Sequence, residues 1–110
     1  MKTNLTLLFS LVFLALINGY SQEDKTPVAI NDYAEVISPD TIEIKVLEND
    51  FAYDNHPFKI HFAVGGSHGT ILKTDTSIFY SASLAFQGLD SITYNIIDLE
   101  NNLISDVARV

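Results

Sequence analysis

The side chains best suited to binding a metal ion lie in one short stretch of the sequence. Four residues there have oxygen-bearing side chains: Asn49, Asp50, Asp54 and Asn55. A calcium ion takes about six to eight oxygen ligands from carboxylates, amides, carbonyls and water, so this stretch predicts a calcium loop. Ala52 and His56 in the same stretch supply no oxygen. The alternative interpretation is that Asn and Asp occur here because they tolerate turn geometry and cap backbone groups.

A second candidate is the run Gly65–Gly69 (GGSHG), which spells the G-x-S-x-G pattern of a hydrolase nucleophile. That pattern acts on a strand–turn–helix in a large α/β sheet, and no helical pattern follows it here. We therefore interpret the run as a hairpin between strands. The three histidines, His56, His61 and His68, are five and seven residues apart, which is not the spacing of a helical zinc pair. The sequence therefore predicts no enzyme.

The composition limits the classes of partner. The 110 residues contain 6 Lys and Arg against 14 Asp and Glu, a formal net charge of -8. Binding to nucleic acid needs clustered cations, so nucleic acid is not an expected partner. The sequence has no cysteine, which excludes disulfide bonds, cysteine-ligated zinc and thiol catalysis.

The first 21 residues have the layout of a secretory signal peptide. Lys2 precedes the apolar run Leu5–Ile17, and small residues follow at Gly19 and Ser21. A helix over that apolar run spans roughly 20 Å, too short to cross a hydrocarbon layer of about 30 Å comfortably. We therefore expect a signal peptide over residues 1–21, a polar leader over residues 22–26 and one domain over residues 27–110. The mature protein is expected to be secreted or at the cell surface, without membrane insertion.

The elements that must position these loops are short strands. Apolar and polar residues alternate with period two over residues 41–46, 58–62, 77–80 and 91–97, and a last strand is expected over residues 103–110. The alternation predicts these inward side chains: Ile42, Ile44, Val46, Phe58, Ile60, Phe62, Ile78, Tyr80, Ile92, Tyr94 and Ile96. We therefore predict an all-β fold, an antiparallel two-sheet sandwich of about seven strands.

Asp90 and Tyr94 have the spacing of a tyrosine corner. In that motif an inward tyrosine near the start of a strand donates its hydroxyl proton to a nearby backbone group. The alternative interpretation is an ordinary inward tyrosine, whose ring packs in the core without that local bond.

Several short motifs occur in order: PVAIND at residues 27–32, VLEND at residues 46–50, HGT at residues 68–70, and GLDSITY at residues 88–94. The ordered set resembles the bacterial cadherin-like, immunoglobulin-like domains that occur as tandem repeats in surface adhesins. The resemblance implies a Greek-key sandwich that serves as a spacer or adhesive module and is often supported by calcium. It also matches two further acids to acids of the family, so the expected calcium ligands are Asp32, Asn49, Asp50, Asp54 and Asp98.

Sequence and resemblance together predict an exported, non-catalytic module for adhesion or spacing at the bacterial cell surface. Its expected partners are neighbouring domains or other surface proteins. A carbohydrate-binding module is the alternative, with glycans as partners and with Phe51, Tyr53 or Phe86 as stacking platforms. A secreted hydrolase centred on Ser67 and His68 is a further alternative.

Overall fold

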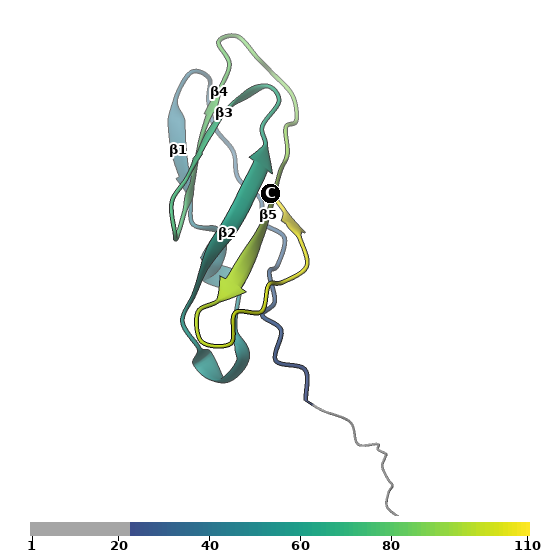
Figure 1. The fold of residues 1–110 in the computed structure, drawn as a ribbon. Coiled ribbons are helices and arrows are strands. Elements are labelled where there is room, and N and C mark those ends of the chain that lie inside the picture. Colours follow the sequence, from purple (N-terminus) through teal and green to yellow (C-terminus); the bar gives the residue numbers. More distant parts are fainter. Residues whose placement is uncertain (1–22) are drawn as a thin grey trace, which may run out of the picture.

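The computed structural model describes residues 23–110, and the predicted signal peptide over residues 1–21 lies outside the described residues. Six strands form two antiparallel sheets (Figure 1). One sheet has the order β1–β4–β3, with bounds Thr41–Ile44, Ile78–Ala82 and Gly69–Lys73. The other has the order β2–β5–β6, with bounds Phe58–Gly65, Ile92–Asp98 and Ala108–Arg109. Two 3-10 helical turns, η1 (Val46–Asn49) and η2 (Tyr53–Asn55), connect β1 to β2.

The connections make a Greek-key sandwich, because β1 pairs with β4 and β2 pairs with β5, so that the chain crosses between sheets. The predicted all-β class is therefore confirmed, with six strands. Residues 28–32 form no strand; their backbone–backbone hydrogen bonds are the bridge between Val28 and Phe51 and one bond in which the Asp32 N–H donates to the Arg109 carbonyl. The last predicted strand shortens to β6. Among residues 23–110, no helix is long and apolar enough to cross a membrane.

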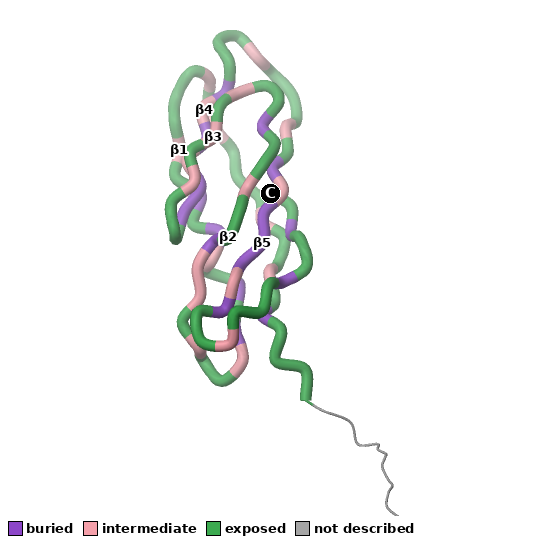
Figure 2. Tube along the Cα trace, in the orientation of Figure 1, coloured by how far each residue is buried: buried purple, intermediate pink, exposed green. Residues whose placement is uncertain are grey.

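The core lies between the sheets and is centred on β5 (Figure 2). Ile92, Tyr94 and Ile96 are all buried there, which confirms the predicted inward face of this strand. Val46 is also fully buried, although it belongs to η1 rather than to the end of a strand as predicted. The remaining buried apolar core comes from both sheets: Ile44, Ile60, Ile78, Tyr80, Ala82 and Ala108.

Two local predictions are wrong for geometric reasons. Phe62 is exposed, because the pairing of β2 with β5 shifts by one residue between Ile60 and Phe62. Such a bulge reverses the alternation, so Ala63 packs against the core instead. The run Gly65–Gly69 is a turn but not a hairpin, because β2 and β3 belong to different sheets.

Residues near the two ends of the described chain contact opposite ends of β5. The Asn101 side-chain amide donates to the Lys25 carbonyl just beyond the end of β5, where the described chain enters. Val110 instead exchanges both backbone hydrogen bonds with Ile92, at the start of β5. The strand between these points is about 20 Å long at about 3.3 Å per residue. The two ends of the described chain are therefore separated by the length of the central strand.

Candidate functional site

Tyr94, in the middle of β5, places its hydroxyl among four oxygen atoms. The Tyr94 Oη atom lies 2.7 Å from Asp50 Oδ2, 3.0 Å from Asp32 Oδ2, 3.1 Å from the Ile30 carbonyl and 3.3 Å from the Val46 carbonyl. The side chain is fully buried. A hydroxyl donates one proton, so one donor serves four acceptors. We call Asp32, Asp50 and Tyr94 the Tyr94 cluster.

The two carboxylates of the Tyr94 cluster hold a proton more tightly than carboxylates in water. Burial raises the pKa of Asp50, although hydrogen bonds from the Ile30 N–H and from Tyr94 oppose the shift. Burial also raises the pKa of Asp32, and the neighbouring Asp50 charge adds to that shift. Burial and the Asp50 carboxylate raise the pKa of Tyr94 far above its usual range. Tyr94 is therefore a neutral donor at every ordinary pH.

The Tyr94 hydroxyl does not form the local bond of a tyrosine corner. Its partners lie 44 to 64 residues away in the sequence. Asp90, which the motif pairs with Tyr94, instead accepts the Tyr80 hydroxyl at 2.6 Å. The prediction of an inward ring is confirmed, whereas the predicted local bond is wrong, because residues 30–32 and 46–50 fold against β5 at this point.

Asp98, at the end of β5, is a fully buried carboxylate with its own set of donors. Its Oδ1 atom accepts the backbone N–H groups of Glu100 at 2.7 Å and Asn101 at 3.1 Å. Its Oδ2 atom lies 2.8 Å from His56 Nδ1. Burial acts to raise the pKa of Asp98, but these donors outweigh it and hold the pKa below its usual value. The carboxylate therefore ties η2 to the turn after β5.

The five predicted calcium ligands fall into two groups rather than one. Asp32 and Asp50 meet at Tyr94, and the side-chain amide of Asn49 donates nearby to the Asn31 carbonyl at 3.1 Å. Asp54 is exposed in η2, next to the turn that His56 joins to Asp98. About 13 Å of β5 separates Tyr94 from Asp98. Within residues 23–110, no three His, Cys, Asp or Glu side chains form a group that could hold a metal ion.

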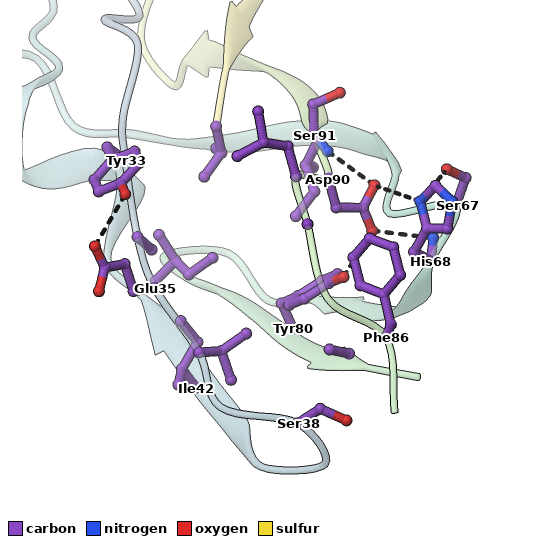
Figure 3. A pocket seen from close by; sticks show the side chains of 18 of the residues that line it. Tyr33, Glu35, Ser38, Ile42, Ser67, His68, Tyr80, Phe86, Asp90 and Ser91 are labelled. Carbon is purple, nitrogen blue, oxygen red and sulfur yellow. Dashed lines mark hydrogen bonds and ion pairs between the residues drawn. The ribbon is translucent and has the colours of Figure 1, made fainter. Parts of the chain in front are cut away.

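A groove of about 1070 Å³ lies on one side of the sandwich, between residues 31–38 and residues 85–91 (Figure 3). Its inner wall includes apolar side chains of the core: Ile42, Ile44, Tyr80, Ala82 and Ile92. Ser67, His68, Phe86 and Asp90 lie together along one side of it. The Ser38 hydroxyl donates to the Ser83 carbonyl at 2.8 Å and so links the two borders.

The comparison with known proteins agrees with this architecture. The family model for the bacterial Ig domain matches residues 24–109. The chain belongs to the bacterial Ig domain family. The two sheets are therefore the immunoglobulin-like sandwich that the motifs predict, and domains of this family are typically extracellular or at the cell surface.

This Ig domain is also similar to part of a curated plant protein. "Protein GAMETE EXPRESSED 2" from Arabidopsis thaliana is 31% identical over 86 residues, which is 78% of this chain. The aligned stretch is 9% of the plant protein, so the Ig domain corresponds to a small part of it. No solved structure matches the chain.

Ser67, His68 and Asp90 of the Ig domain do not form a nucleophilic relay. Ser67 Oγ lies 3.3 Å from His68 Nδ1, and Asp90 Oδ1 lies 3.9 Å from the same nitrogen. A relay needs the serine at one ring nitrogen and the acid at the other. Burial acts to raise the pKa of Asp90, but donors led by the Tyr80 hydroxyl outweigh it and lower the pKa. This carboxylate therefore serves to hold the start of β5.

The aromatic side chains predicted as sugar platforms do not share one surface. Phe51 pairs through its backbone with Val28, and the Tyr53 hydroxyl donates to Glu23, so both lie where the chain enters the domain. Phe86 instead stacks on the His68 ring in the groove, with centroids 4.3 Å apart and an interplanar angle of 11°.

The sequence analysis missed the borders of the groove. Tyr33, Ile37 and Leu89 line it, and all three are at least 79% exposed. They lie in stretches without strand alternation, where large apolar side chains have no core to enter. Apolar residues among turn residues were therefore the available signal.

Proposed function

We propose that this bacterial Ig domain is an exported, non-catalytic module that serves as a spacer or adhesion domain at the cell surface. The observation that carries the proposal is that Lys25 and Val110 contact opposite ends of β5. Contacts at opposite ends of the central strand hold whatever is joined to these two points about one strand length apart. The family supports the location, because its domains are typically extracellular or at the surface.

The geometry around Ser67 supports the non-catalytic part of the proposal. His68 meets both Ser67 and Asp90 at one ring nitrogen, so it cannot pass a proton from the serine toward the acid. Turnover of ester or peptide substrates by the full chain, abolished by Ser67→Ala, would contradict the proposal.

The location is tested with intact cells that express the full chain with an epitope tag after Val110. We expect the tag to be cleaved by protease added to intact cells, or to be found in the medium, while a cytosolic marker stays intact. Deletion of residues 2–21 is the matched control and should keep the tag inside. A full-length chain that stays protected with the cytosolic marker would contradict an exported module.

The adhesive part of the proposal has its own measurement. Cells that display the domain should attach to a host or neighbouring-cell surface more than cells that display the same carrier protein without the domain. Equal attachment by the two populations, at equal display, would leave spacing as the function and contradict adhesion.

Calcium support stays a prediction, and the oxygen atoms around Tyr94 are its best support. Asp32, Asp50 and two carbonyls supply hard oxygen ligands there, whereas the Asp98 oxygens already accept three donors. Millimolar CaCl2 should raise Tm relative to MgCl2, and Asp50→Asn should abolish the rise. An equal Tm in both salts would contradict calcium support.

Glycan binding also stays a prediction. Phe86 is its best support, because the ring lines a groove that also contains carboxylates. A glycan array probed with the full chain and with Phe86→Ala tests it. A spacer should bind no glycan, so binding that Phe86→Ala removes would favour the carbohydrate-binding alternative.

A further inference from the structure

The most exposed apolar side chains of the described domain gather at the borders of one groove. Four large apolar residues in residues 23–110 are more than three-quarters exposed: Tyr33 at 79%, Ile37 at 80%, Leu84 at 81% and Leu89 at 89%. Three of these line the groove, and Leu84 precedes Ala85, which also lines it. Clustered exposed apolar side chains next to a groove indicate an interaction surface rather than scattered surface residues.

The backbone at one border of the groove is free to pair with an added strand. Within the described chain, residues 33–36 make no backbone–backbone hydrogen bond, and they lie along the groove. Strand β1 pairs with β4 alone, so its second edge is also without a strand partner among residues 23–110. Unpaired edges accept extended peptides, which add main-chain hydrogen bonds while side chains fill pockets.

The length and the inner wall of the groove fit a short strand. Its border runs from Asp32, which bonds Arg109, to Ser38, which bonds Ser83, a span of about 20 Å when extended. That length holds a segment of about six residues, three of whose side chains point the same way. The inner wall offers those side chains an apolar surface, from Ile42 to Ile92.

Charge selects among possible occupants. Asp32, Glu35 and Asp90 line the groove, and Arg109 is the one Lys or Arg among the lining residues. The pKa of Asp90 is held below its usual value, so this carboxylate is ionised at neutral pH. The whole chain carries 14 acids against 6 bases, so a second copy would bring like charge to the groove. A partner segment with Lys or Arg between its apolar residues is complementary.

We propose that this groove binds an extended segment of a partner protein, about six residues long, with alternating apolar and basic side chains, as a strand added beside residues 33–36. The inference deepens the proposed adhesive function by naming the chemistry of its partner. The side chains of Tyr33, Ile37 and Leu89 cover the apolar face of the segment. The exposed carboxylate of Glu35 receives its cations.

The first test is selection of random seven-residue peptides displayed on phage against the full chain. We expect enriched peptides to alternate apolar residues with Lys or Arg, and to bind Ile37→Glu and Leu89→Glu at least tenfold more weakly. Leu72→Glu is the matched control, because Leu72 is 66% exposed on β3, away from the groove, and should bind as the wild type does. No enrichment, or equal loss in the control, overturns the proposal.

The second test separates strand addition from side-chain contact alone. The best selected peptide is compared with a version N-methylated at alternate residues, which keeps the side chains and removes main-chain donors. Methylation should weaken binding at least tenfold, and the unmodified peptide should slow amide hydrogen exchange at residues 33–36. Unchanged exchange there, binding of a glycan in place of the peptide, or dimerisation of the chain through Leu89 would overturn the proposal. An exported domain that binds no such peptide would refute this inference and leave the proposed function standing.

Discussion

Replacing Tyr94 with phenylalanine tests whether one hydroxyl holds three distant segments together. The substitution keeps the fully buried ring and removes only the O–H at the centre of four oxygen atoms. A hydrogen bond to a charged group contributes about 1.5–3 kcal/mol, and Asp50 would keep only its bond from the Ile30 N–H. We therefore expect Tyr94→Phe to lower the free energy of unfolding by about 2 kcal/mol, or Tm by roughly 8–16 °C.

Thermal and urea unfolding followed by circular dichroism at pH 7 measure this loss. Tyr33→Phe is the matched control, because the Tyr33 hydroxyl also donates to a carboxylate, Glu35 at 3.0 Å, but on a side chain that is 79% exposed. Bonds at the surface contribute little, so the control should change the free energy of unfolding by less than about 0.5 kcal/mol. Equal losses in the two variants would refute the claim that burial makes the Tyr94 bond strong.

Three further substitutions test the other contacts. Hydrogen bonds hold the Asp98 pKa below 3.8, so the ionised carboxylate stabilises the fold above that pH, and this stabilisation is lost as the pH falls through the pKa of the folded state. Asp98→Asn should therefore reduce the fall in Tm at acid pH, and an unchanged fall would contradict this. Burial raises the Asp50 pKa, so protonated Asp50 stabilises the fold below pH 3.8, and this stabilisation is lost as the pH rises through the pKa of the folded state. Asp50→Asn should remove the resulting fall in Tm, and a Tm–pH profile identical to that of the wild type would disprove this. A Cβ on Gly69 would clash with the Ser81 carbonyl, so Gly69→Ala should lower the free energy of unfolding in urea by about 2 kcal/mol, whereas the exposed Ser67→Ala should match the wild type.

The all-β fold could be predicted from the sequence because β5 carries its own pattern. Ile92, Tyr94 and Ile96 alternate without interruption, and all three are buried at the centre of the core. Alternation reports which face of a strand is covered, so it works wherever a strand pairs regularly. The bulge after Ile60 breaks that condition, and the exposure of Phe62 could not be read from residue types.

The candidate site was predictable in its residue types but not in its grouping. The sequence places Asp50 and Asp54 four residues apart, which suggests one loop and one ion. In the fold η1 ends between β1 and Asp50, and the chain then turns through η2, so Asp50 faces Tyr94 while Asp54 is exposed. The contact that decides the position of Asp50 joins it to Tyr94, 44 residues away, and spacing along the chain carries no such information.

The buried carboxylates do the work that covalent bridges do in many small exported domains. The chain has no cysteine, yet Asp50 joins residues 30 and 94, and Asp98 joins His56 to the turn after β5. A buried charge is tolerated only with its donors in place, so losing one donor costs more than the bond alone. At Asp98 every donor is an N–H or a histidine nitrogen, and a cation there would have to displace them. At Asp50 a single hydroxyl proton serves two carboxylates, which leaves uncompensated negative charge. Any calcium effect on Tm should therefore disappear in Asp50→Asn and persist in Asp98→Asn. The opposite pattern would show that calcium acts at Asp98 and not at Asp50.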